Sequence, residues 1–216
     1  MSRSPIIIYE DMAVRYAPSF ILPYETDQST ANFGVEFTEE INFDAVYFSA
    51  SGLKKITVSS DGNILFEQDN ITQPANFGKI NASDVSNVTI ALEAQENNIQ
   101  IDAFKLLRSA VNLGVCAVDF TRSDYAKQGY YYLNDGSLLA WKEYQKAGGR
   151  MNITNCSFGV KNKILKAFEE NSFLSFQLNP DIDAAALYDF ALVKAPTEKF
   201  DIKTGLFELE LNLAQR

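Results

Sequence analysis

The chain of 216 residues contains no histidine and only two cysteines. Without histidine, the protein has no imidazole for acid–base catalysis, no Ser-His-Asp triad and no histidine ligand for a metal ion. Cys116 and Cys156 are too few for a zinc site. The favoured interpretation is that both are buried free thiols. The alternative is a disulfide bond between them, which requires that their strands be neighbours. We therefore expect a protein that is not an enzyme and that holds no cofactor.

Other signatures are missing as well. The sequence has no P-loop, no G-x-G-x-x-G and no G-x-S-x-G. The opening segment "MSRSPIIIYEDM" has an apolar run too short for a secretory leader, and no run is long enough to span a bilayer. The net charge of −9 repels phosphate backbones and anionic membranes. Nucleic acid and membranes are therefore not expected as partners.

Carboxylates are the remaining candidates for catalytic or metal-binding groups. A glycosidase needs two of them facing each other across a sugar, and the sequence does not show which would converge. The candidates are Glu39, Glu40, Asp119, Asp124, Asp181 and Asp183. Calcium is a weaker alternative at Asp181 with Asp183, or at Asp61 with Asn63, because neither stretch matches an EF-hand loop. Helix capping by Asp181 and a turn at Asp61 are the favoured interpretations.

From about residue 35 the apolar residues alternate with polar ones, which is typical of half-buried strands. The clearest hairpin is "LKKITVSSDGNILFEQ", in which Asp61–Gly62 suits a type I′ turn. Short strands recur about every ten residues, as in a β-sandwich. Residues 1–35 carry three prolines and are expected to be irregular, with short extended pieces. We predict a β-sandwich domain over residues 1–108.

The second half, residues 109–216, is predicted to be a β-rich assembly domain with one short helix. The segment "VKNKILKAFEEN" has the helical pattern, with Ile164, Leu165 and Phe168 on the apolar side. The segment "SLLAWKEYQKA" fits a helix or a strand, and the flanking turns favour the strand. The chain closes on "LFELELNL", a regular half-buried strand that could pair within its own sheet or form an exposed edge.

Aromatic and apolar residues are the candidates for an interaction surface. Tyr130 and Tyr132 lie in a run of three tyrosines, whose alternate rings point to opposite faces of a strand. Trp141 could stack on a sugar or belong to the core, and the core is favoured. In the closing strand, the candidates are Phe207, Leu209 and Leu211. Tyrosine and tryptophan are enriched where proteins meet.

A resemblance adds to this interpretation. Residues 30–108, through "FDAVYFSA", "KKITVSSDGNILFE" and "IQIDAFKLLRS", resemble the galactose-binding-like jelly roll in outline. The segments that follow, "DGSLLAWKEYQKAGGRMNITN", "NKILKAFEEN", "FLSFQLNP" and "LFELELNLAQ", are similar in order to structural or tail-associated virion proteins of tailed bacteriophages. The resemblance is a pattern of apolar positions without a diagnostic motif, and it transfers no active-site residues.

The resemblance implies a mainly β protein, with a jelly-roll domain packed on the second domain. It implies a non-enzymatic structural protein of the virion, a tail or tail-adaptor component assembled in the host cytoplasm. Its partners would be copies of itself and other virion proteins, joined by symmetric contacts. The alternative is a carbohydrate-binding module with a glycan as its ligand. A carboxylate-only glycoside hydrolase is ranked last.

Overall fold

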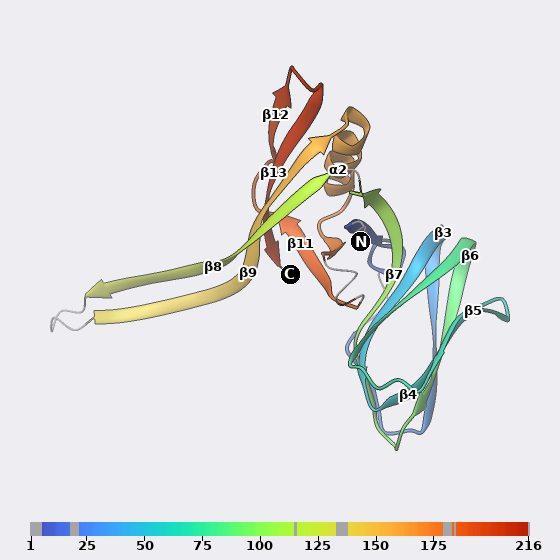
Figure 1. Ribbon diagram of the computed structural model, residues 1–216. Helices are drawn as coiled ribbons and strands as arrows, with labels where there is room; N and C mark the ends of the chain where they lie inside the picture. Colours follow the sequence, from blue (N-terminus) through green and yellow to red (C-terminus); the bar gives the residue numbers. More distant parts are fainter. Residues whose placement is uncertain are drawn as a thin grey trace. The chain divides into compact units, whose positions relative to one another are not determined.

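We analysed a computed structural model of the full chain (Figure 1). It describes the backbone of residues 6–17, 22–114, 116–132, 138–178, 183 and 185–215, and the side chains of these residues except 123–132 and 138–146. The described chain is mainly β and antiparallel, as predicted. It divides into two compact units, which are described separately: unit 1 (Met1–Ala110 and Gln177–Leu187) and unit 2 (Val111–Phe176 and Tyr188–Arg216).

The division falls two residues beyond the boundary drawn from the sequence. The sequence did not indicate that the segment Gln177–Leu187 groups with the first half of the chain. The elements of the first half are β1 (Ile7–Asp11), α1 (Met12–Tyr16), β2 (Tyr24–Thr26), β3 (Thr30–Ser51), β4 (Leu53–Ser60), β5 (Asn63–Asp69), β6 (Ala75–Ala94) and β7 (Ile99–Asn112).

The strands of unit 1 neighbour each other in the order β5-β4-β6-β3-β7-β1, and β2 also pairs with β7. The predicted hairpin is β4–β5, with Ser60 opposite Asn63. Asp61 and Gly62 form its turn at φ of 48° and 80°, the positive values that a type I′ turn requires. The long strands β3 and β6 pair from end to end, with register shifts in the stretch between Glu36 and Ala45.

Alternating residues of these strands form the core of unit 1. In β4, Ile56 and Val58 are fully buried, while Thr57 between them is partly exposed. Phe48 of β3 is also fully buried, and its ring meets that of Phe66 in an edge-on contact. The period of two in the sequence therefore marks the residues that face the interior.

The first 35 residues are more regular than predicted. The run Ile7–Asp11 is a strand, and the five-residue helix α1 follows it directly. Asp11 caps this helix, because its side chain accepts hydrogen bonds from the backbone N–H groups of Ala13 and Val14. Five residues are too few to display a helical period, so only the capping residue could have indicated the helix.

The elements of the second half are β8 (Ala117–Tyr132), β9 (Leu138–Cys156), α2 (Phe158–Glu170), β10 (Leu174–Gln177), β11 (Leu187–Leu192), β12 (Thr197–Asp201) and β13 (Leu206–Gln215). Their order in unit 2 is β10-β11-β13-β9-β8, and β12 also pairs with β13. The ambiguous segment, residues 137–147, belongs to strand β9 from Leu138 onward, and residue 137 lies outside the described residues.

The closing strand β13 lies inside the sheet of unit 2. One of its edges pairs with β9 from Phe207 to Ala214. It also pairs with β11 and with β12. Of the two alternatives that the sequence left open, pairing within its own sheet is therefore the one found.

The predicted helix is α2, which begins two residues before the quoted segment. Ser157 caps it by accepting a hydrogen bond from the N–H of Val160. Ile164 and Ala167 are buried. The predicted polar face is exposed at Lys163, Lys166, Glu169 and Glu170. One apolar stripe on an otherwise charged helix thus determines which side packs inward.

Candidate functional site

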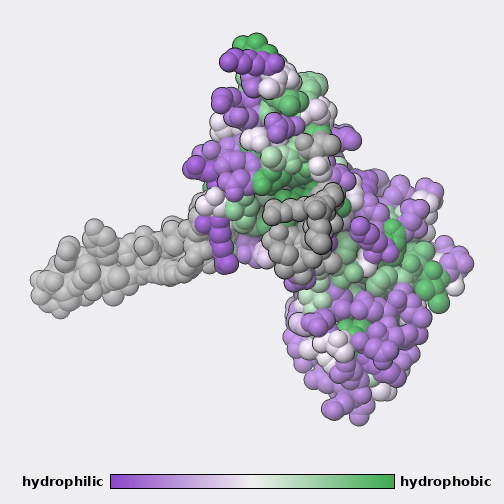
Figure 2. All heavy atoms as spheres, in the orientation of Figure 1, coloured by the Kyte–Doolittle hydropathy of each residue, from purple (hydrophilic) through white to green (hydrophobic). Residues whose placement is uncertain are grey.

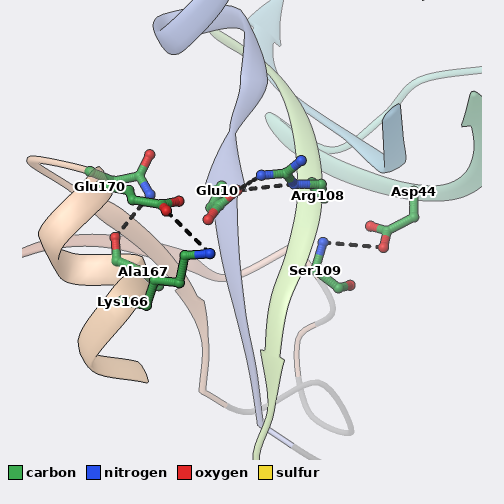
Figure 3. A network of polar contacts seen from close by, with 8 residues as sticks. Glu10, Asp44, Arg108, Ser109, Lys166, Ala167 and Glu170 are labelled. Atoms are coloured by element: carbon green, nitrogen blue, oxygen red, sulfur yellow. Dashed lines mark hydrogen bonds and ion pairs between the residues drawn. The ribbon is translucent and has the colours of Figure 1, made fainter. Parts of the chain in front are cut away.

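A polar cluster with a buried charge lies in unit 1, where β1 meets β7. Arg108 donates from Nε to Oε2 of Glu10 at 3.0 Å and forms a second hydrogen bond to the same oxygen through Nη2 (Figure 3). The Glu10 side chain is 5% exposed and that of Arg108 is 39% exposed. A carboxylate so deeply buried needs such a partner, because an unpaired charge in the interior is costly.

A second carboxylate belongs to the same unit. Oδ2 of Asp44 accepts a hydrogen bond of 3.1 Å from the backbone N–H of Ser109, while its buried Oδ1 has no hydrogen-bond partner among the described residues. Burial, and next the negative charge of Asp44, raises the pKa of Tyr9 to about 12, and a hydrogen bond with Ser109 opposes this shift. Tyr9 is therefore neutral at pH 7 and Glu10 is paired with Arg108, which favours a structural role for these two residues over acid–base work.

The carboxylates named from the sequence do not form a comparable cluster. Glu39, Glu40, Asp119 and Asp183 are exposed, whereas Asp181 and the side chain of Asp124 lie outside the described residues. Asp183 accepts a hydrogen bond from the N–H of Ala185, as a residue that begins a turn does. Among the described residues there is no group of three or more histidine, cysteine, aspartate or glutamate side chains that could hold a metal ion.

At the second calcium candidate, Asp61 with Asn63, the turn conformation and a nearby hydrogen bond explain the role of Asp61. Asp61 supplies the first positive-φ position of the β4–β5 turn, and its Oδ1 accepts a hydrogen bond of 3.4 Å from Nδ2 of Asn87. Asn63 is the first residue of β5 and is exposed. The turn role expected for Asp61 is thus the one observed.

The predicted interaction residues fall into two groups. Tyr130 lies on β8 opposite Ala140, and Tyr132 lies opposite Leu138 on β9. Trp141 lies on β9 opposite Gly129. The side chains of Tyr130, Tyr132 and Trp141 lie outside those that the structure describes.

The second group lies on β13. Leu209 is 2% exposed and Leu211 is fully buried, because both face the core of unit 2. These two leucines are therefore covered within the chain, and only Phe207 among the three is partly exposed. Alternation along the strand explains why leucines two residues apart share the inner face.

The hairpin β8–β9 is a two-stranded ribbon that extends beyond the rest of its sheet. The two strands pair from Ala117–Thr154 out to Tyr132–Leu138, with one register shift between Lys127 and Gln128. By contrast, β13 accompanies β9 only from Cys156 to Gly148. Among the described strands, the ribbon beyond Gly148 has no third strand, and β8 has no neighbour on its outer edge. Figure 1 shows β8 and β9 continuing side by side past the end of β13.

An aromatic cluster that the sequence analysis missed lies between α2 and the β12–β13 hairpin. The ring centroid of Phe207 lies 4.9 Å from that of Phe200 and 6.1 Å from that of Phe158. Lys161 places its ammonium 4.7 Å from the Phe207 ring and 2.9 Å from Oε2 of Glu198. Predicting this cluster from the sequence would have required knowing that β12 pairs with β13, which brings Phe200 opposite Phe207.

Part of this cluster faces the surface. Phe158 is 63% exposed and Phe200 is 52% exposed, and Ile202 in the β12–β13 turn is 86% exposed. Figure 2 shows apolar side chains at the outer end of this hairpin. Exposed apolar groups gathered in one place can mark a contact surface.

No protein-family model matches the chain, and no curated protein matches it. No helix in the described part of the chain combines the length and hydrophobicity needed to cross a lipid bilayer.

Proposed function

We propose that this chain is a non-enzymatic structural protein of a tailed-bacteriophage virion, a tail or tail-adaptor component that works through contacts with copies of itself and with other virion proteins. The observation that carries the proposal is the β8–β9 ribbon, which extends beyond β13 with both outer edges unpaired among the described strands. An isolated two-stranded ribbon is marginally stable in water. A partner that covers the ribbon would supply the missing stabilisation.

The composition of the ribbon supports a protein partner. Between residues 125 and 146 the sequence has six aromatic residues: Tyr125, Tyr130, Tyr131, Tyr132, Trp141 and Tyr144. Tyrosine and tryptophan dominate the energetics of protein interfaces. A free strand edge also offers unpaired N–H and C=O groups to a strand of another chain.

Charge favours contact between the ribbon and the body of another copy. Lys127, Lys142 and Lys146 against Asp135 and Glu143 give residues 125–146 a formal charge of +1. Because the net charge of the whole chain is −9, the residues outside this segment carry a formal charge of −10. Two acidic bodies repel each other, whereas the ribbon meets no such barrier.

We also propose that unit 1 is a jelly-roll β-sandwich of the galactose-binding-like kind. The long strands β3 and β6 change register between Glu36 and Ala45. Such bulges bend a strand, and bent strands allow a sheet to fold over its own core. The buried residues of β3, β4, β6 and β7 in one apolar cluster agree with that arrangement.

Shortening the ribbon tests the proposal. Tyr125 and Lys146 are register partners, so replacing residues 126–145 with Asn-Gly joins them through a two-residue type I′ turn. We expect the full chain to form a discrete oligomer at micromolar concentration, measured by size-exclusion chromatography with light scattering, and the shortened chain to be monomeric and folded. A monomeric full chain, or a shortened chain that still assembles, would contradict self-assembly through the ribbon.

Point variants provide a matched control. Replacing Tyr130, Tyr132 and Trp141 with serine should weaken assembly, because these residues lie on the ribbon. Replacing Val14 and Ile64, which are 61% and 63% exposed outside the ribbon, should leave assembly unchanged.

Retention on a glycan array without assembly would favour the carbohydrate-binding alternative. Neighbouring genes for portal, tail or capsid proteins would support the virion assignment.

A further inference from the structure

The two cysteines meet at the base of the ribbon. Cys116 immediately precedes β8 and Cys156 ends β9, and their Sγ atoms lie 3.6 Å apart as free thiols. A disulfide bond is about 2.05 Å long, so closing the pair needs a sulfur displacement of only about 1.5 Å. Both residues belong to unit 2.

A local irregularity in β9 produces this placement. Ile153 and Cys156 are both fully buried although they are three residues apart, which regular alternation would place on opposite faces. Leu209 lies opposite Ile153 and Phe207 lies opposite Cys156, so β9 has one more residue than β13 in this stretch. Asn155 takes up the extra residue at a φ of 60°. Such bulges redirect side chains.

The two thiols are chemically unequal. Cys116 is partly exposed, whereas Cys156 is fully buried. Burial, and then the hydrogen bond with Cys116, raises the pKa of Cys156 to about 12. Thiol–disulfide exchange needs a thiolate with access to its target. A soluble disulfide therefore reaches Cys116 first, and Cys156 acts second.

We infer that Cys116 and Cys156 are a modification site, a dithiol that a small-molecule disulfide such as oxidised glutathione converts into an intrachain disulfide across the base of the β8–β9 ribbon. In the first step, the Cys116 thiolate attacks one sulfur of oxidised glutathione and releases one glutathione thiolate. In the second step, the Cys156 thiolate attacks the Cys116 sulfur and releases the other. The protein loses two electrons and two protons, and one oxidised glutathione becomes two reduced molecules.

The bond would fasten the ribbon where it leaves the sheet. It encloses the whole of β8 and nearly all of β9, and so restricts the unfolded chain over that span. The inference depends only on the geometry of unit 2, and it holds whether or not the ribbon binds a partner.

Peptide mapping tests the inference directly. The reduced full-length chain is incubated with oxidised glutathione, alkylated and digested with trypsin without reduction. We expect a cross-linked pair of peptides, 109–122 with 151–161, and no alkylated cysteine. Free thiols on both residues, a stable glutathione adduct on the unmutated chain, or a disulfide between two chains would overturn the inference.

Single substitutions separate the two steps. Cys156→Ser should stop at one glutathione adduct on Cys116, because the second thiol is missing. Cys116→Ser should react far more slowly, because the remaining thiol is buried. The oxidised parent should melt about 5 °C or more above the reduced parent, and a thiol reductant should reverse the shift. Equal adduct formation on the two single variants would contradict the assigned order.

Discussion

Arg108 on β7 donates two hydrogen bonds to one carboxylate oxygen, Oε2 of Glu10 on β1. The pair joins residues 98 positions apart in the sequence. Because the Glu10 side chain is 5% exposed, water cannot replace the guanidinium if it is removed. Arg108 therefore supplies the positive charge that offsets the burial of Glu10, in addition to the pairing of β1 with β7 in the sheet.

Arg108→Met should accordingly destabilise the protein by about 2 kcal/mol, less than for a fully buried pair because Arg108 itself is partly exposed. The free energy of unfolding in urea measures the change. The surface pair Lys199–Glu208, with side chains 74% and 46% exposed, provides the control. Lys199→Met should cost no more than about 0.5 kcal/mol. Equal losses in the two variants would show that burial of Glu10 has no energetic consequence.

The pKa of Tyr9 predicts how stability falls at high pH. The folded-state pKa of about 12 lies above the ordinary value of 10.0, so the unfolded chain loses this proton first as the pH rises. The contribution of Tyr9 to stability is fully present below pH 10 and is lost between pH 10 and pH 12, by up to about 3 kcal/mol. Urea unfolding of the parent and of Tyr9→Phe at pH 8, 10 and 11.5 measures it. The parent should lose stability relative to Tyr9→Phe as the pH rises, and parallel stability curves would contradict the predicted linkage.

Residue patterns that act over a few neighbours could be predicted from the sequence. Asp61–Gly62 specified a hairpin turn because positive φ suits few other residues. The stripe through Ile164 specified α2, because period and charge agree along the segment.

Features that depend on which strands become neighbours could not be predicted. The sequence left open whether β13 is an edge and whether Cys116 meets Cys156. The contact of Phe200 with Phe207 requires that β12 pair with β13, and β12 was not predicted. The bulge at Asn155 depends on a register shift against β13, which no local pattern indicates.

Gly149 marks a close approach between β9 and β8. A Cβ at this position would lie 2.5 Å from the Phe120 ring and 2.7 Å from the carbonyl oxygen of Thr121. Gly149→Ala should therefore destabilise the protein by about 1–3 kcal/mol, because the ring and the backbone must both shift. Gly34→Ala is the matched control, since its nearest atom would be 4.0 Å away. It should be neutral or slightly stabilising in thermal unfolding. A neutral Gly149→Ala variant would mean that Phe120 repacks freely.

Lys161 connects α2 to the β12–β13 hairpin by two different interactions. Its side chain is only 12% exposed, and its ammonium contacts the Glu198 carboxylate at 2.9 Å and the faces of Phe207 and Phe158 at 4.7 and 5.2 Å from their centroids. Lys161→Met keeps most of the volume and removes the charge. It should lower the free energy of unfolding by about 1 kcal/mol, the combined size of a cation–π contact and a partly buried ion pair.

The matched control is Lys166, which lies on the same helix with its side chain 72% exposed. In the described part of the chain it forms an ion pair with Glu170, one turn away (Figure 3). Lys166→Met should change stability by no more than about 0.5 kcal/mol. Salt discriminates the two sites further, since screening weakens an exposed pair more than a buried one. The deficit of Lys161→Met should therefore persist at 1 M salt, and its disappearance there would show that the ammonium is held by ordinary surface attraction and not by the aromatic cluster.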